Sequence, residues 1–66
     1  MQEHFLRRQQ VEQMTGLARS TIYKKMSEGT FPAPYKLHGR AVAWSSIEID
    51  DWIQQVKSGA DLQRAA

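Results

Sequence analysis

The chain has 66 residues, with nine Lys and Arg against seven Asp and Glu, and no Cys. This length predicts one domain, and a single core below roughly 70–80 residues supplies little stability. Disulfides are excluded, and His4 and His38 lie too far apart, without a carboxylate cluster beside either, to predict a metal site or another cofactor. The longest apolar run, Ala41 to Trp44, is far shorter than the roughly 20 residues of a membrane span. We therefore expect an intracellular, most simply cytoplasmic, protein that does not contact a membrane.

Charge is segregated along the sequence. Residues 1–40 carry seven Lys and Arg against three Glu, a net charge of +4, whereas residues 41–66 carry two basic against four acidic residues, a net charge of −2. Such segregation favours a polyanionic partner, although a solvated basic surface without a partner would show the same pattern.

The first predicted element is a short amphipathic helix from Arg8 to Thr15. Val11 and Met14 stand three residues apart in an otherwise polar segment, and Gly16 ends the helix. Gly16 also permits a sharp reversal, and the apolar Leu17 is placed to pack at the junction with a second helix.

A second helix is predicted from about Arg19 to Glu28, with Gly29 as its left-handed stop. The side chains expected to point inward repeat at every fourth position: Ala18, Ile22 and Met26. Ala18 is a poor N-cap, so Ser20 is an alternative capping residue. The exposed surface combines cations with hydroxyl donors near the helix N-terminus, the end that meets bases and phosphates in a major groove. Its members are Arg19, Ser20, Thr21, Tyr23 and Lys24.

Residues 35–44 predict a basic β-hairpin, because Pro32 and Pro34 exclude a helix before it. With His38-Gly39 as the two-residue loop, Leu37 faces Arg40 and Tyr35 faces Val42. One face then carries Tyr35, Leu37, Val42 and Trp44. The other carries Lys36, Ala41 and Ala43, with Arg40 close to the tip. Arg40 is a candidate phosphate or minor-groove contact, unless it stacks on Tyr35 or Trp44.

The last helix is predicted at about Ser46 to Lys57. Ser45 and Glu48 match a capping box, and an apolar stripe follows with i, i+3, i+4, i+7 spacing: Ile49, Trp52, Ile53 and Val56. Both Trp44 and Trp52 are interpreted as core residues, and we expect Trp52→Ala to be largely unfolded. Residues 1–58 form the predicted domain, and residues 59–66 a tail that is frayed or a short helical extension.

These elements predict a mainly α fold with a small β-hairpin, in the arrangement of a winged helix-turn-helix. An enzyme is not indicated, because the sequence has no Cys, no paired carboxylates near a His and no Gly-rich phosphate loop, and no small-molecule substrate is expected. A protein-binding adaptor is the alternative, with the acidic last helix as its docking surface.

An ordered string of motifs resembles the AlpA-type prophage regulators. The string comprises Thr15 to Lys24, Gly29 to Pro32, Gly39 to Trp44, Glu48-Ile49 and Trp52-Ile53. The resemblance implies a winged-helix DNA-binding protein related to the MerR and excisionase group, which regulates a prophage or mobile element through integrase expression or excision. An excisionase-like factor that bends DNA is the alternative within the same group.

The resemblance places Arg19, Ser20, Thr21, Tyr23 and Lys24 on the recognition helix and Arg40 on the wing. Arg8 and Lys36 complete the candidate DNA-binding set, Arg8 because the first helix begins beside the DNA backbone in such a complex. For Tyr23, packing at the edge of the core and contact with a phosphate are equally supported. The expected partner is double-stranded DNA, with a second copy, an integrase or another regulator as further candidates.

Overall fold

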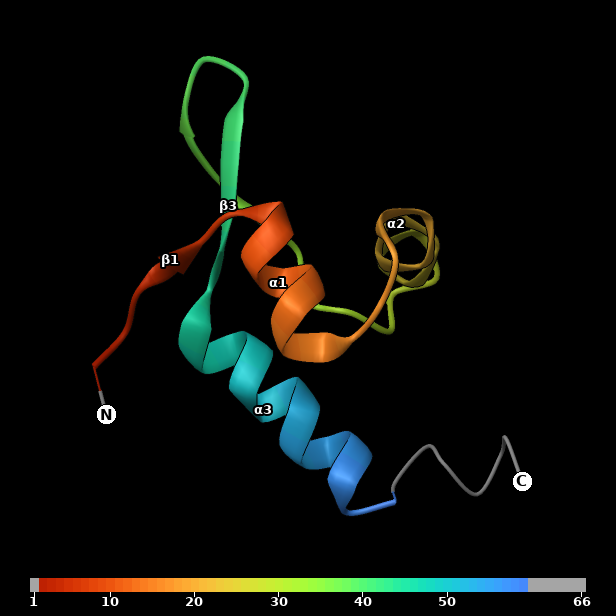
Figure 1. Ribbon diagram of the computed structural model, residues 1–66. Coiled ribbons are helices and arrows are strands. Elements are labelled where there is room, and N and C mark those ends of the chain that lie inside the picture. Colours follow the sequence, from red (N-terminus) through yellow and green to blue (C-terminus); the bar gives the residue numbers. More distant parts are fainter. Residues whose placement is uncertain (1, 60–66) are drawn as a thin grey trace.

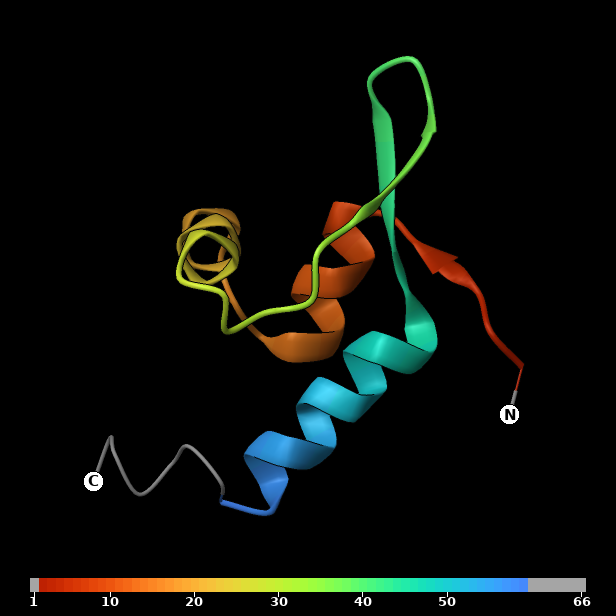
Figure 2. The same cartoon turned by 180° about the vertical axis from the view of Figure 1, so that it is seen from behind.

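A computed structural model describes residues 2–59 of the chain. The elements in this range are β1 (Phe5–Leu6), α1 (Arg8–Thr15), α2 (Arg19–Ser27), β2 (Tyr35–His38), β3 (Ala41–Ser45) and α3 (Ser46–Lys57). The strands form an antiparallel sheet in the order β1-β3-β2. Figures 1 and 2 show the β2-β3 hairpin projecting beyond the helices, with α3 at the opposite end of the molecule.

The turn between α1 and α2 follows the sequence prediction. Gly16 has a φ of 75°, and its N–H donates to the Glu12 carbonyl at 2.8 Å. The Thr15 hydroxyl donates to the Val11 carbonyl at 2.8 Å and accepts from the Leu17 N–H at 3.3 Å. Leu17 packs against the core as expected. The helix-turn-helix reversal is therefore stabilised by both backbone and side-chain hydrogen bonds.

The start of α2 differs from the prediction in two ways. Ala18 is the N-cap residue, has an extended backbone conformation and is exposed, so the expectation that it points inward was wrong. Ser20 lies inside the first turn and is not the cap. An extended N-cap residue precedes the helical repeat, so its side chain does not follow the direction of the residues four and eight positions later. Ile22, which is fully buried, anchors the helix, and Met26 packs at the edge of the core.

A two-residue strand, β1, was not predicted. Its residues pair with the end of β3, Phe5 with Ser45 and Leu6 with Trp44. The His4 N–H donates to the Ser46 Oγ at 2.7 Å, and the Ser46 N–H donates to the His4 carbonyl at 2.7 Å. These bonds attach the N-terminal segment to the junction between β3 and α3.

The hairpin forms, but the predicted register was wrong. The observed pairs are Tyr35 with Ala43, Lys36 with Val42 and His38 with Ala41, and the register shifts at Leu37. The turn consists of Gly39 and Arg40, not of His38 and Gly39. Gly39 has a φ of 51°, and a two-residue hairpin turn with glycine first needs a positive φ only at that position. Leu37 is the extra residue of a bulge.

The shifted register exchanges the two faces of the hairpin. Tyr35 shares a face with Ala43 and Phe5, whereas Trp44 faces the opposite side, so the predicted face of Tyr35, Leu37, Val42 and Trp44 does not exist. The rings of Phe5 and Tyr35 lie 6.2 Å apart on this outer face. Tyr35 is 47% exposed and Leu37 is 38% exposed, so neither contributes to the core.

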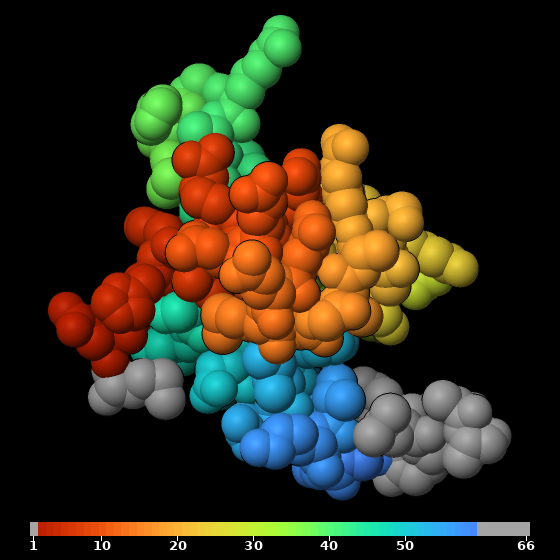
Figure 3. All heavy atoms as spheres, in the orientation of Figure 1, coloured from red at the N-terminus to blue at the C-terminus, as the bar shows by residue number. Residues whose placement is uncertain are grey.

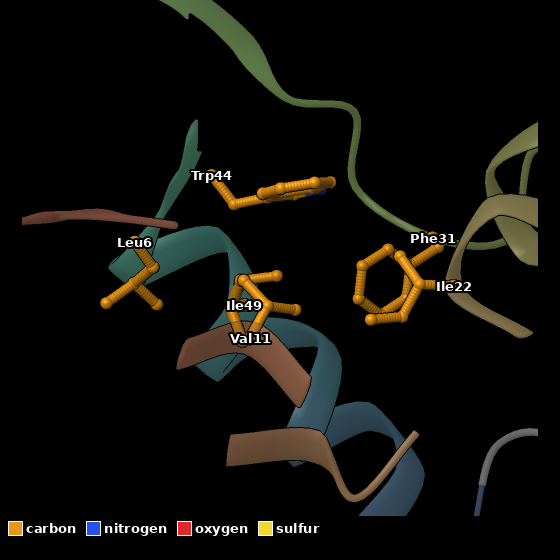
Figure 4. Packing of buried hydrophobic residues seen from close by; sticks show 6 residues of the cluster. All are labelled: Leu6, Val11, Ile22, Phe31, Trp44 and Ile49. Atoms are coloured by element: carbon orange, nitrogen blue, oxygen red, sulfur yellow. The ribbon is translucent and has the colours of Figure 1, made fainter. Parts of the chain in front are cut away.

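Every element except β2 contributes to one hydrophobic core. Its buried members, shown in Figure 4, are Leu6, Val11, Ile22, Phe31, Trp44 and Ile49. Trp44 is fully buried, and its indole Nε1 donates to the Pro32 carbonyl at 3.0 Å. The indole thus satisfies its single donor while filling the space between the sheet and the helices.

The last helix begins at Ser46 as predicted, with the Ser45 hydroxyl accepting from the Glu48 N–H at 3.3 Å, which is one half of the predicted capping box. The other half is not formed, because the Glu48 carboxylate accepts from the Tyr35 hydroxyl. Of its apolar stripe, Ile49 is fully buried and Trp52 is partly buried. Trp52 contacts the Phe31 ring edge-on, with the centroids 5.0 Å apart, and its Nε1 donates to the Thr30 carbonyl at 3.0 Å. Trp44, not Trp52, is therefore the tryptophan at the centre of the core.

The arrangement is a winged helix-turn-helix, as predicted. α1 and α2 form the helix-turn-helix, the β2-β3 hairpin is the wing, and α3 covers the core. Among residues 2–59, no helix is long and apolar enough to cross a bilayer. The domain boundary after residue 58 stays a prediction, and the predicted tail lies outside the described residues except for Gly59.

Candidate nucleic-acid interface

Two basic elements present exposed surfaces, α2 on one flank of α1 and the hairpin beyond the helices. Figure 3 shows the hairpin standing clear of the body at the end opposite α3. We refer to the exposed surface of α2 as the α2 surface and to the β2-β3 hairpin as the wing. Both are positioned by core residues, α2 by Ile22 and the wing by Trp44 at the end of β3.

The α2 surface carries the residues expected from the sequence. Arg19 and Ser20, in the first turn, are exposed, as is Tyr23 one turn later, whereas Thr21 is partly buried on the flank. The first turn contains no acidic residue. A helix N-terminus with free N–H groups, one guanidinium and one hydroxyl is suited to an anion or to the edges of bases.

Arg19 lies against Tyr23 on this surface. The guanidinium carbon is 5.8 Å from the centroid of the Tyr23 ring, within the range of a cation–π interaction. Tyr23 is 41% exposed. The structure therefore does not show Tyr23 packed into the core, and its ring face contacts the Arg19 guanidinium; contact of its hydroxyl with a phosphate stays a prediction.

Lys24 is exposed as predicted, but it occupies the last turn of α2 together with Lys25. Lysines at this position are favoured by the negative end of the helix dipole without any ligand. Lys24 is therefore about one and a half turns away from Arg19 and belongs to the other end of the α2 surface.

Arg8 is the candidate with an evident internal partner. Its Nε lies 2.9 Å from the Glu12 Oε2, one turn along α1, and the two side chains are 36% and 30% exposed. This pair neutralises part of the positive charge at the start of α1, and an exposed pair of this spacing contributes about 0.3–0.5 kcal/mol. The i, i+4 spacing would have revealed it from the sequence.

The wing presents its cations without such partners. Lys36, on β2, and Arg40, in the turn, are both exposed. Within residues 2–59, Arg40 makes no salt bridge and no cation–π contact, so the alternative in which it stacks on Tyr35 or Trp44 is not observed. Arg40 therefore projects a full positive charge from the tip of the hairpin.

Three acidic residues lie on α3, which runs away from the wing tip, although Glu48 in its first turn contacts Tyr35 of the wing. Glu48, Asp50 and Asp51 follow one another along its first two turns. Figure 1 shows α3 running away from the sheet, on the side of the molecule opposite the wing tip. Among residues 2–59, the wing tip and the greater part of α3 thus carry charges of opposite sign at opposite ends of the molecule.

Sequence reasoning missed one contact that attaches the wing to the body. The Tyr35 hydroxyl donates to the Glu48 Oε2 at 2.7 Å, so β2 is linked to the first turn of α3. The hydrogen bond to the carboxylate and its negative charge raise the pKa of Tyr35 above 10.0. No sequence signal indicates this pair, because it depends on the shifted register of the hairpin.

Comparisons of the sequence with known proteins find a family model and relatives that match most of the chain. The family model described as "Prophage CP4-57 regulatory protein (AlpA)" matches residues 4–57. The chain is 44% identical over 52 residues to "Uncharacterized protein ORF88" of Enterobacteria phage P4, an alignment that covers 79% of this chain and 59% of that protein. It is 39% identical over 56 residues to "DNA-binding transcriptional activator AlpA" of Escherichia coli strain K12, covering 76% of this chain and 80% of that protein.

The chain thus spans less than two thirds of the phage P4 protein and most of the E. coli protein. The range that matches the family model begins just before β1 and ends with the last residue of α3, so it includes the helix-turn-helix and the wing together. The predicted resemblance is confirmed, and the chain belongs to the AlpA family of prophage regulatory proteins.

Proposed function

We propose that this protein binds double-stranded DNA sequence-specifically and regulates transcription from a prophage or mobile element. The observation that carries the proposal is the joint exposure of the α2 surface and the wing, with the acidic α3 at the far end. The family match and the name of the E. coli relative support the same function.

In this proposal α2 enters the major groove with its N-terminal turn toward the bases. The Arg19 guanidinium reads the O6 and N7 acceptors of a guanine, the commonest specific contact of an arginine. Ser20 donates to a base edge or a phosphate, and Thr21 contacts the groove wall from the flank. Free N–H groups at the start of the helix add a favourable interaction with a phosphate.

The wing lies along the flanking backbone or in the adjacent minor groove. Arg40 at its tip and Lys36 on β2 neutralise phosphates, which adds affinity for every sequence equally. Arg8 contributes less than these two, because Glu12 already occupies its Nε. Lys24 contacts the backbone near the C-terminal end of α2.

One winged-helix unit of this size covers little DNA. A single module typically buries about 600–1,000 Å² of protein surface on DNA, so high specificity requires several copies on adjacent sites or a helper protein. We propose that occupancy of such a site controls integrase expression or excision of the element. No catalytic step is needed, since regulation follows from occupancy alone.

Selection of bound sequences from a random duplex pool tests the proposal. A short sequence common to the recovered duplexes identifies the operator. The spacing of its repeats shows how many copies of the protein bind side by side and in which orientation. The selected duplex and a scrambled duplex are then titrated at two salt concentrations, because phosphate contacts weaken as salt rises. Equal affinity for both duplexes, or no binding at low salt, would refute sequence-specific DNA binding and favour the protein-binding adaptor.

Two variants and one matched control sharpen the test. Arg19→Ala and Ser20→Ala should lower affinity for the selected duplex more than for the scrambled one, without a change in melting temperature. Lys57→Ala is the matched control, because it also removes a positively charged surface side chain but lies on α3, outside the proposed interface. It should leave both affinities nearly unchanged.

A further inference from the structure

The contact between Arg19 and Tyr23 has a geometry that suits recognition better than stability. The two residues are one turn apart on α2, the ring is 41% exposed, and the guanidinium carbon lies 5.8 Å from its centroid. Because Ile22 is fully buried, Tyr23 is the surface neighbour one turn along the helix against which the Arg19 side chain can lie. The pair therefore stands entirely on the α2 surface.

The partner of a guanidinium decides what it can still bind. A carboxylate partner uses its N–H donors, as Glu12 does with the Nε of Arg8. An aromatic ring attracts the guanidinium through the ring face and leaves the N–H donors free at the edge of the guanidinium plane. In residues 2–59, no acidic side chain pairs with Arg19, so its donors are available to a ligand.

We propose that Tyr23 is a positioning residue, which holds the Arg19 guanidinium in the orientation that reads a guanine. The inference rests on the proposed function and deepens it, because it assigns the base read by the α2 surface and a separate role to Tyr23. Tyr23 acts through its ring, and its hydroxyl is not required for base recognition.

The expected effect follows from the cost of ordering a long side chain. Arginine is among the side chains with the most rotamer freedom, and a ring that restricts it lowers the cost of forming the bidentate contact. An exposed cation–π contact corresponds to an effect of about two- to fivefold in affinity. The guanine contact itself corresponds to about 5- to 150-fold discrimination between bases.

The experiment uses the full chain and the duplex recovered by selection. Each guanine is replaced in turn by 7-deazaguanine, which lacks the N7 acceptor and keeps the Watson–Crick pairing. Affinity is measured for the unmodified duplex and for each 7-deazaguanine duplex. The proteins are wild type, Arg19→Ala, Tyr23→Phe, Tyr23→Leu and the double variant R19A/Y23L. Melting temperatures are measured for the same five proteins.

Wild type should lose about tenfold or more in affinity on replacing one particular guanine, because one hydrogen bond to a charged group is removed. Arg19→Ala should not distinguish the two duplexes. Tyr23→Leu should reduce the discrimination by about two- to fivefold, whereas Tyr23→Phe should keep it. In the background of Arg19→Ala, the change of Tyr23 to Leu should have no measurable effect, since the two residues act as a unit.

Three results would overturn the inference and leave DNA binding intact. Undiminished discrimination by Tyr23→Leu would mean that Arg19 needs no support from the ring. An equal loss of affinity for all duplexes in Tyr23→Phe and Tyr23→Leu, with discrimination unchanged in both, would mean that the hydroxyl contacts a phosphate and that the ring does not position Arg19. A lowered melting temperature for Tyr23→Leu with unchanged discrimination would mean that the ring only stabilises the helix. Failure of selection to recover any common sequence would instead refute the proposed function itself.

Discussion

The burial of Trp44 makes a strong prediction about stability. Its side chain is fully buried, and a Trp buries about 150–250 Å², which at about 25 cal/mol per Å² corresponds to about 4–6 kcal/mol. Measured Trp→Ala changes in cores cost about 3–5 kcal/mol. The change also removes the donor to the Pro32 carbonyl. A core of this size rarely supplies more than about 3–5 kcal/mol, so Trp44→Ala should be unfolded at room temperature.

Thermal and urea unfolding followed by far-ultraviolet circular dichroism would measure this effect. Trp52→Ala is the matched comparison, because it removes the same atoms from a partly buried position beside Phe31. Because Trp52 is only partly buried, the change should lower the free energy of unfolding by less than Trp44→Ala does, by about 2–3 kcal/mol. It should lower the melting temperature by about 8–24 °C, with a cooperative transition retained. This revises the sequence-based expectation that Trp52→Ala is largely unfolded.

A third variant separates packing from hydrogen bonding. Trp44→Phe keeps an aromatic ring but leaves the Pro32 carbonyl without the Nε1 donor, so it should fold with reduced stability. A cooperative melt of Trp44→Ala at or above the midpoint of Trp52→Ala would refute the assignment of Trp44 as the centre of the core.

Three further predictions concern the wing, the link to α3 and the turn. Arg40→Ala should weaken binding to all duplexes and lower the slope of log affinity against log salt by about 1, with no loss of thermal stability, whereas Lys57→Ala should not change the slope. Absorbance titration of tyrosinate should show that Glu48→Gln returns the pKa of Tyr35 toward 10.0. Since folding raises this pKa, the stabilisation is complete below pH 10.0 and is lost as pH rises through the raised value. Gly16→Ala should lower the free energy of unfolding by about 1–2 kcal/mol, because alanine is strained at a φ of 75°. No steric clash adds to this loss, since nothing lies within 4 Å of an added Cβ. An unchanged melting temperature would argue against the backbone strain.

The sequence predicted the helices well because their signals are local. The bounds of α1 and α3 agree with the prediction, and α2 ends one residue earlier. The period of apolar residues, the Ser45 cap and the left-handed Gly16 each act within one or two turns of chain. The motifs around these signals were also sufficient to identify the family.

The candidate site was predicted in composition but not in its pairings. The exposure of Arg19, Ser20 and Arg40 agrees with the predicted interface, although DNA contact by these residues stays a proposal. The contact of Arg19 with Tyr23 has the same i, i+4 spacing as the Arg8 pair and could have been read from the sequence.

The sequence by itself determined the helices, the presence of a hairpin, the segregation of charge and the family. Only the tertiary structure decided the two-residue strand β1, the hairpin register and the depth of each tryptophan. β1 has no local signal, because two residues become a strand only when β3 offers an edge to pair with. A one-residue shift of the hairpin register moves each side chain of one strand to the other face of its partner without changing the composition. The turn at Gly39 and packing against the helices therefore decided which β2 side chains share a face with Trp44.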